Sequence, residues 1–343
     1  MDLKVSRTRL RLKRELQTSF GVLRERETIT VCLTDADGVA GYGEASPLEP
    51  YDGVSIERVH HALERYREVL TQNPGAQSIQ LIEACRAVDD LPQALAAIDL
   101  ALWDRAGRRR GLPVCSLITD APATAVPVNA TVSASDRASA AEQAAAAARA
   151  GFGCLKVKVG VGDDAGRLAA VRAAAGSGVL LRVDANGAWE VEQAVRAINA
   201  LEPVGLELVE EPTHGLRAIQ EVRARVAARV AIDETAAEPG ALGANAADAV
   251  CLKISRCGGI SNLLAAATLV RTAGAEAYIS SSLDGPLGVA AAVHAAAGLA
   301  AHGPMPHCGL ATLDLFEDLD GLLPVRSGEI EPPRSPGLGV SPP

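Results

Sequence analysis

The sequence predicts an α/β fold in two parts: a modified (β/α)7β barrel of the TIM type, with an α+β capping domain ahead of it. After residue 123, short apolar strands alternate with helix-length segments at a spacing of about 25 residues, which is typical of βαβ units and a parallel sheet. No glycine-rich G-x-G-x-x-G turn follows these strands, so a closed barrel is favoured over an open dinucleotide-binding sheet. Before residue 122, strand patterns are followed by helical patterns, which indicates a separate α+β unit.

The first part of the chain contains three expected strands and two expected helices. Two stretches of alternating character lie within residues 10–33, and the Asp-Ala-Asp-Gly sequence at 35–38 predicts a hairpin turn before a third strand. Helical patterns follow at residues 55–70 and 92–106. The boundaries that we predict are a capping domain over residues 1–122, a barrel over 123–309, and a segment over 310–343 that returns to the capping domain.

Composition excludes several classes of function. Hydrophobic residues make up 48% of the 343 residues, which is enough for a large core. The formal net charge of −9 argues against a nucleic-acid partner, which requires a basic face. We expect no membrane partner and no signal peptide, because no long apolar run occurs and the first ten residues are charged. The seven cysteines are scattered singly, so we expect a cytoplasmic protein with reduced thiols, and a homo-oligomer is an open possibility.

Charged residues follow the apolar strands of the expected barrel. The expected strands end at Thr131, Lys158, Asp184, Glu210, Asp233, Lys253 and Ser281, each followed by an alanine-rich segment of helical length. Asp184, Glu210 and Asp233 are 26 and 23 residues apart, which is one βα unit each. They should therefore meet at the C-terminal face of the barrel, where barrel enzymes keep their active sites. Three converging carboxylates call for a cation, and a set of oxygen ligands favours Mg²⁺.

Lysines flank the three carboxylates. Lys156 and Lys158 lie on the same side of one strand, since side chains alternate along a strand, and Lys253 ends a later strand. Each residue alone has a plainer explanation: a strand-end Asp is often a helix cap, Glu210 could pair with Arg182, and a lysine in a strand often extends to solvent. The three carboxylates in register, with lysines on both sides, favour a functional site.

These motifs resemble the muconate-lactonizing subgroup of the enolase superfamily. The pattern matches in order and spacing over nearly the whole chain, and the segments at 18–21 and 41–45 resemble the capping domain of that family. The resemblance implies Mg²⁺, with Mn²⁺ as a substitute, and a small carboxylate substrate. The residues that it implies are the metal ligands Asp184, Glu210 and Asp233, the catalytic lysines Lys158 and Lys253 with Lys156 beside them, and the supporting residues Asn186, Glu211 and Glu234.

The proton abstraction that the resemblance implies requires a lysine base and a bound cation, and the residue types found here could supply both. A proton next to a carboxylate is barely acidic, so the enediolate that forms must be stabilised by positive charge, which a divalent cation supplies. Lysine is a usable base when its pKa is lowered, and positive charge from Lys156 and the metal would lower the pKa of Lys158.

The last strands favour one reaction of the family. Residues 279–284 and 307–315 resemble o-succinylbenzoate synthases. Dipeptide epimerases of the subgroup carry Asp-x-Asp at the end of the eighth strand to hold the substrate ammonium, and Cys-Gly-Leu at 308–310 takes that place here. We therefore expect syn-dehydration of 2-succinyl-6-hydroxy-2,4-cyclohexadiene-1-carboxylate, a step of menaquinone synthesis. The substrate-binding residues that we expect are Ser19, Phe20, Ser281, Ser282 and Asp284.

Other activities stay open at this point. An N-acylamino acid racemase or dipeptide epimerase needs two lysines as paired acid and base, and both are present. A muconate cycloisomerase would use the same motifs, and a catalytically silent barrel that only binds ligands is a further alternative. One departure from the family concerns Asp284, where the family usually has Glu, so its role at the seventh strand is open.

Overall fold

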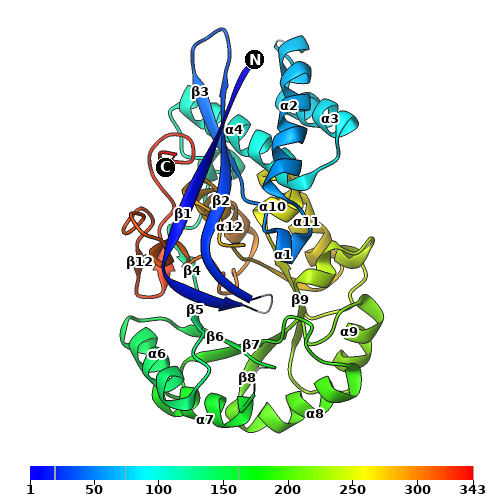
Figure 1. Cartoon of the computed structure of the whole chain (residues 1–343), viewed down its shortest axis with the longest axis vertical. Coiled ribbons are helices and arrows are strands. Elements are labelled where there is room, and N and C mark those ends of the chain that lie inside the picture. Colours follow the sequence, from blue (N-terminus) through cyan, green and yellow to red (C-terminus); the bar gives the residue numbers. More distant parts are fainter. Residues whose placement is uncertain (19–20, 74, 161, 343) are drawn as a thin grey trace.

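A capping domain and a barrel make up the computed structural model, which describes residues 1–18, 21–73, 75–160 and 162–342. Figure 1 shows the capping domain above the barrel, with the long β1–β2 hairpin extending down to the barrel. This arrangement agrees with the fold class that the sequence predicts. Ser19 and Phe20, two expected substrate contacts, lie outside the described residues.

The capping domain is an antiparallel sheet covered by helices. The order of its strands is β1-β2-β3. Its elements are β1 (Asp2–Thr18), β2 (Gly21–Thr34), β3 (Ala40–Ala45), α1 (Glu49–Asp52), α2 (Ile56–Gln72), α3 (Ser78–Val88), α4 (Pro92–Arg110) and α5 (Cys115–Ile118). Alternation along β1 and β2 places Leu3, Ile29, Val31 and Leu33 in one apolar core with the helices. The expected turn at residues 35–38 is present, closed by the Gly38 N–H on the Asp35 carbonyl at 2.9 Å.

Two glycines allow β3 to lie directly on α4. A Cβ at Gly41 would stand 2.1 Å from the Ala101 carbonyl oxygen, and one at Gly43 would stand 2.0 Å from that of Ala97. Only glycine fits such a close approach of two backbones. The contact brings the strand that carries Glu44 against the helix that borders the barrel.

The barrel is built on seven parallel strands in the order β11-β10-β9-β8-β7-β6-β5. The strands are β5 (Ala130–Val132), β6 (Cys154–Lys158), β7 (Leu180–Asp184), β8 (Leu206–Glu210), β9 (Val230–Ile232), β10 (Ala249–Leu252) and β11 (Glu276–Ile279). The last residues of β6, β7 and β8 are those that the sequence predicts. Cys308 and Gly309 close the barrel, because Cys308 pairs with Val128 and Gly309 pairs with Ser280.

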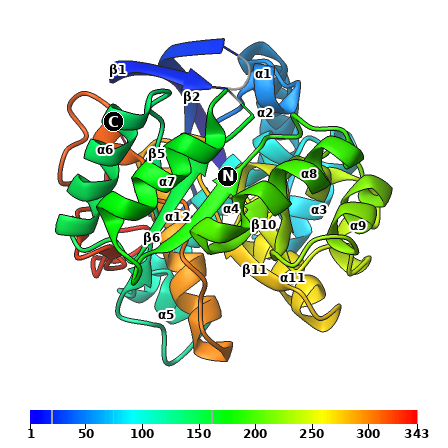
Figure 2. The same ribbon diagram turned by 90° about the horizontal axis from the view of Figure 1, so that it is seen from below.

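Helices surround the barrel strands, as the view from below shows (Figure 2). They are α6 (Arg137–Arg149), α7 (Asp164–Ala175), α8 (Val191–Leu201), α9 (Leu216–Arg223), α10 (Ile254–Cys257), α11 (Ile260–Thr272) and α12 (Pro286–Leu299). The expected helix between β9 and β10 is absent: this fully described stretch holds two 3-10 turns, η2 (Glu234–Ala237) and η3 (Ala241–Gly243). Pro239, Gly240 and Gly243 disfavour a continuous helix there.

Helix α12 links the two domains. Each of its residues is buried, and it contacts α4 and β3 of the capping domain as well as β11 of the barrel. A helix that is apolar on all sides belongs in an interior, and alanine and glycine let its neighbours approach closely. No helix within the described ranges is long and apolar enough to cross a bilayer.

The C-terminal segment runs back along the capping domain. The Glu317 N–H donates to the Arg11 carbonyl at 2.9 Å, and the Leu338 N–H donates to Asp104 Oδ1 at 2.7 Å. Between these contacts, β12 (Val325–Arg326) and β13 (Glu329–Ile330) form a small sheet with β4 (Val126–Pro127). Turn η4 (Ala300–His302) follows α12, and η5 (Leu313–Leu315) follows the barrel closure.

Candidate active site

Three buried carboxylates converge at the C-terminal end of the barrel. Asp184 and Glu210 are in register on neighbouring strands β7 and β8, and Asp233 follows β9. Their exposures are 1%, 0% and 4%. Lys156 joins the first two, because its Nζ lies 2.9 Å from Asp184 Oδ2 and 2.7 Å from Glu210 Oε1. The three expected metal ligands are therefore brought together by the strand order.

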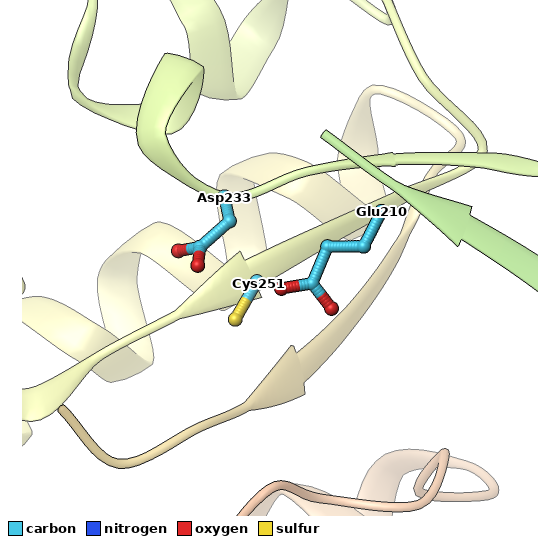
Figure 3. Close-up of side chains that lie close together, drawn as sticks. All are labelled: Glu210, Asp233 and Cys251. Atoms are coloured by element: carbon cyan, nitrogen blue, oxygen red, sulfur yellow. The ribbon is translucent and has the colours of Figure 1, made fainter. Parts of the chain in front are cut away.

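A thiol also points into this centre. Ligand atoms of Glu210, Asp233 and Cys251 all lie within 4.8 Å of one another, and Figure 3 shows the three side chains pointing toward one another. Cys251 precedes Lys253 by two residues, so strand alternation directs both side chains to the barrel interior. Cys251 was not predicted as a site residue, although this alternation is visible in the sequence.

Lysine ammonium groups neutralise the carboxylates. Lys158 Nζ lies 2.6 Å from Asp184 Oδ2, and Lys253 forms an ion pair with Asp233. Burial would raise the pKa of Asp184, but Lys156 and Lys158 outweigh burial and lower it. Burial would lower the pKa of Lys253, but Asp233 outweighs burial and raises it. The alternative partnership of Glu210 with Arg182 does not form, because Arg182 pairs with Glu207.

The donor set fits a hard divalent cation. Oxygen atoms of Glu210 and Asp233 lie within 4.8 Å of each other, and Lys156 bridges Glu210 to Asp184. Burial together with Asp184 raises the pKa of Glu210, although Lys156 opposes this. Oxygen donors of this kind are what Mg²⁺ prefers, while one buried thiol is not a preferred ligand of Mg²⁺. Asp184, Glu210 and Asp233 are thus the residues that would hold such an ion.

Glu211 fixes the backbone that carries Asp233. Its Oε2 accepts a hydrogen bond from the Asp233 N–H at 2.7 Å, and its Oε1 accepts one from the Thr235 N–H at 3.0 Å. Glu211 itself has a φ of +41°, a conformation in which non-glycine residues are uncommon. Asn186 and Glu234, the other two expected supporting residues, hydrogen-bond to each other at 3.0 Å beside Lys158. Burial and Asp233 raise the pKa of Glu234 to about 7.

Two tyrosines that sequence analysis missed hold the carboxylates. The Tyr278 hydroxyl on β11 donates to Glu210 Oε2 at 2.8 Å, and the Tyr51 hydroxyl on α1 of the capping domain donates to Asp233 Oδ1 at 2.8 Å. Arg256 donates to the Tyr51 oxygen at 2.8 Å. Tyr278 lies two residues before Ser280 on an interior-facing position, so alternation could have found it. The bond from Tyr51 to Asp233 could not be predicted, because it joins two domains.

Replacing Tyr51 by phenylalanine should lower the free energy of unfolding by about 1.5 kcal/mol, since it removes a hydrogen bond to a buried charged group. Urea unfolding in EDTA, followed by circular dichroism, measures the change. Tyr42→Phe is the matched control, because the Tyr42 hydroxyl makes no hydrogen bond within the described part of the chain. Equal stability of the Tyr51 and Tyr42 variants would contradict the contact.

A cavity of about 370 Å³ lies between this centre and the capping domain. Lys156, Lys158 and Lys253 line it together with Asp184 and Asp233. The capping domain contributes Leu16, Thr18, Leu48 and Tyr51 to the wall. A second cavity of about 570 Å³ lies behind Lys253 and is lined mainly by small apolar residues of η2, η3 and α11. Only the first cavity contacts all three lysines, so it is the candidate substrate cavity.

Uncharged hydroxyl groups form the wall of this cavity near the barrel closure. Ser281 and Ser282, both expected substrate contacts, line the cavity, as do Gly309 and Thr312. The Oγ of Ser282 and the Oγ1 of Thr312 are buried and have no hydrogen-bond partner within the described ranges. Gly309 packs against Ser280, since a Cβ there would stand 2.0 Å from the Ser280 hydroxyl.

Asp284 does not line the cavity. It is 1% exposed, and its Oδ2 accepts a hydrogen bond from the Ser282 N–H at 3.3 Å. Arg26 lies nearby and donates to the Leu283 carbonyl at 3.3 Å, while Glu44 accepts a hydrogen bond from the Gly285 N–H at 2.7 Å. Asp284 therefore belongs to a buried polar cluster between the capping domain and the barrel, and it reaches the cavity only through the Ser282–Leu283 loop.

Comparison with known families agrees with this geometry. Residues 1–119 match the mandelate racemase / muconate lactonizing enzyme N-terminal domain, and residues 139–343 match the enolase C-terminal domain-like family. The chain belongs to the enolase superfamily.

Curated members of the enolase superfamily with different activities are similar to this chain. An L-Ala-D/L-Glu epimerase of Bacillus subtilis (strain 168) is 28% identical over 357 residues, with 98% of this chain and 95% of that protein covered. An o-succinylbenzoate synthase of Thermobifida fusca (strain YX) is 37% identical over 238 residues, with 63% of this chain and 72% of that protein covered. Membership of the superfamily therefore leaves the substrate open.

A solved superfamily structure supports the arrangement of the domains. The dipeptide epimerase of Enterococcus faecalis V583, in complex with Mg and the dipeptide L-Leu-L-Tyr, matches with a TM-score of 0.90 at 27% identity and covers 99% of both chains. That relative contains magnesium and a small-molecule ligand. The acidic centre of the present chain is consistent with a similar ion.

Proposed function

We propose that this enzyme removes a proton next to a substrate carboxylate and eliminates water, converting 2-succinyl-6-hydroxy-2,4-cyclohexadiene-1-carboxylate to o-succinylbenzoate. Lys158 takes the proton from the carbon next to the carboxylate, and the resulting ammonium returns it to the departing hydroxyl, so that water leaves from the same face. Lys253 stays protonated and stabilises the enediolate from the opposite side. A divalent cation held by Asp184, Glu210 and Asp233 supplies further positive charge for the enediolate.

The positions of the two lysines support these roles. Lys158 ends β6, Lys253 follows β10, and three strands separate β6 from β10 in the sheet, so the two side chains face each other across the barrel mouth. The Lys158 side chain is 34% exposed and can reach a substrate, whereas that of Lys253 is 7% exposed. Lys253 also lies 5.0 Å from the centre of the Tyr51 ring, which favours its charged form.

The observation that carries the choice of reaction is the uncharged wall near the barrel closure. Among the described residues that line the cavity, the carboxylates are Asp184 and Asp233, and each already pairs with a lysine. A dipeptide ammonium would have no free anionic partner there, and an unpaired buried charge is costly. Ser281 instead offers its hydroxyl proton on this wall, since its Oγ accepts from the Asp284 N–H at 2.8 Å, and Ser282 and Thr312 add no charge to the wall.

Racemisation of an N-acylated amino acid is the second candidate. Inversion requires a proton acceptor on one face of the carbon and a donor on the other, and lysines on opposite sides of the cavity satisfy this requirement. The similarity to the Bacillus subtilis epimerase supports inversion chemistry as well. An N-acyl group carries no ammonium, so it suits the uncharged wall better than a free dipeptide does.

The proposal predicts that, of the three substrate types, the cyclohexadiene gives the highest kcat/KM. The purified enzyme with Mg²⁺ is assayed against this compound, a series of N-acylamino acids and a series of dipeptides, with dehydration followed by absorbance and inversion by chiral chromatography. A Lys158→Ala preparation purified in parallel shows that any activity arises in this site. Faster inversion of an N-acylamino acid or a dipeptide than dehydration would overturn the choice.

A further inference from the structure

A chain of hydrogen bonds connects Lys158 to an acid three strands away in the sheet. Lys158 Nζ donates to Asn186 Oδ1 at 2.6 Å, and Asn186 Nδ2 donates to Glu234 Oε1 at 3.0 Å. Lys158 ends β6, Asn186 lies in the loop after β7, and Glu234 begins η2 after β9. The side chain of Asn186 thus joins two loops of the barrel mouth directly beside the proposed base.

The backbone of Asn186 is fixed, but its amide group has two possible orientations. Its φ is +46°, a left-handed conformation that asparagine tolerates, and its N–H donates to Asp184 Oδ1 at 3.0 Å. The side-chain amide has an acceptor at one end and a donor at the other. A lysine ammonium offers only donors, so Lys158 requires the oxygen of the amide. An acceptor on the other side is what holds the oxygen in that direction.

Glu234 supplies that acceptor. Its other oxygen, Oε2, is buried and has no hydrogen-bond partner within the described part of the chain. The bond from Asn186 is therefore the one hydrogen bond that this carboxyl group makes among the described residues. Keeping a largely buried carboxyl group next to Asp233 with half of its oxygens unused is costly, so a purely packing role does not account for it.

We propose that Glu234 is a positioning residue for Lys158 and acts through Asn186. By fixing the amide, Glu234 keeps an acceptor in front of the Lys158 ammonium and holds this group between Asn186 and Asp184, at the edge of the substrate cavity. Without Glu234 the amide loses one of its two side-chain partners, so Oδ1 is held in front of the lysine less firmly. The inference rests on the proposed function, in which Lys158 is the base.

Two uncharged variants of Glu234 show whether it acts by positioning Asn186 or through its negative charge. Glu234→Gln keeps an oxygen that can accept from Asn186, whereas Glu234→Ala removes it, and both lose the same charge. We expect Glu234→Ala to lower kcat about tenfold with little change in KM, and Glu234→Gln to keep most of kcat. In an Asn186→Ala background, Glu234→Ala should cost nothing further, because the residue through which it acts is already absent. Glu190→Ala, an exposed acid in the loop after β7, is the control.

A measurement without substrate makes the test independent of the reaction. The chain has five lysines, of which Lys4 and Lys13 are exposed, so selective 15N labelling of lysine gives few side-chain signals. Lys158 is assigned by its loss in Lys158→Ala. Its Nζ signal should shift in Glu234→Ala and in Asn186→Ala and stay close to wild type in Glu234→Gln.

Two results would overturn the positioning role of Glu234, and a third would overturn only the choice of reaction. Equal loss of kcat in the Gln and Ala variants, with effects that add to those of Asn186→Ala, would overturn positioning and assign Glu234 a role through its charge. An unshifted Lys158 signal in Glu234→Ala would overturn it as well. Failure to dehydrate the cyclohexadiene overturns only the choice of reaction, because the kinetic comparison then uses whichever carboxylate the enzyme turns over and the lysine signals need no substrate.

Discussion

Exhaustive chelation with EDTA should abolish turnover and leave the barrel folded, and Mg²⁺ or Mn²⁺ should restore activity. Activity should be lost because the enediolate then lacks the positive charge of the ion. The fold should persist because Lys156, Lys158 and Lys253 pair with the three carboxylates and neutralise their mutual repulsion. Circular dichroism and a substrate assay on the same sample measure both effects.

The Asp233→Asn variant tests the metal assignment at a single proposed ligand. Glu211 holds the backbone N–H of residue 233, so the amide should stay in place while its charge is lost. We expect Mg²⁺ affinity to fall by at least about a hundredfold, measured by calorimetry, because removing an ionised ligand costs more than the ten- to hundredfold typical of outer contacts. Glu190→Gln, which changes an exposed residue of the loop after β7, should bind Mg²⁺ as wild type does. Full turnover after chelation would refute the metal assignment.

The predictable part of the site consists of residues whose positions follow from strand alternation. An apolar run that ends in a charged residue marks both the end and the direction of a buried parallel strand, which is why Lys158, Asp184 and Glu210 were placed correctly at the ends of β6, β7 and β8. Because the C-terminal ends of such strands meet at one face, their convergence followed without knowledge of the helices.

The small number of lysines is a further signal in the sequence, and it could have strengthened the prediction of the active site. The chain has 28 arginines and five lysines, and three of the five are Lys156, Lys158 and Lys253. Arginine serves as a surface cation but cannot give up its proton near neutral pH, whereas lysine can. In a chain that uses arginine almost everywhere for positive charge, the few lysines that remain therefore point to the proposed proton-transfer site.

The individual bonds between the two domains could not be predicted. Helix α1 has four residues, and nothing in its sequence shows that Tyr51 reaches Asp233 on the other domain. The position of Asp284 was equally hidden, because its burial depends on Arg26 from β2 and Glu44 from β3. Helix α3 was missed since its apolar face, Leu81, Ile82 and Cys85, is short. These features depend on tertiary packing, which a local pattern does not encode.

Lys158→Ala should lower kcat by at least about 10²- to 10⁴-fold, the range typical of general acid–base groups. In the proposed dehydration the same lysine removes the proton and returns it to the hydroxyl, so both halves of the reaction fail together. The Mg²⁺ affinity should change far less, since Asp184, Glu210 and Asp233 are intact. A variant with near-normal kcat would remove Lys158 from the role of base, whatever the substrate.

Variants of Lys253 distinguish dehydration from racemisation. In dehydration Lys253 acts as a fixed cation, so Lys253→Arg should keep part of the activity and Lys253→Ala should lose it, because arginine keeps the charge yet does not release its proton. In racemisation Lys253 must exchange a proton, so both variants should stop inversion alike. The wild-type enzyme in deuterated water gives an independent readout, since a racemase places solvent deuterium at the inverted carbon of its product. If Lys253→Arg is as inactive as Lys253→Ala, and wild type inverts N-acylamino acids with deuterium incorporation, the second candidate replaces the first.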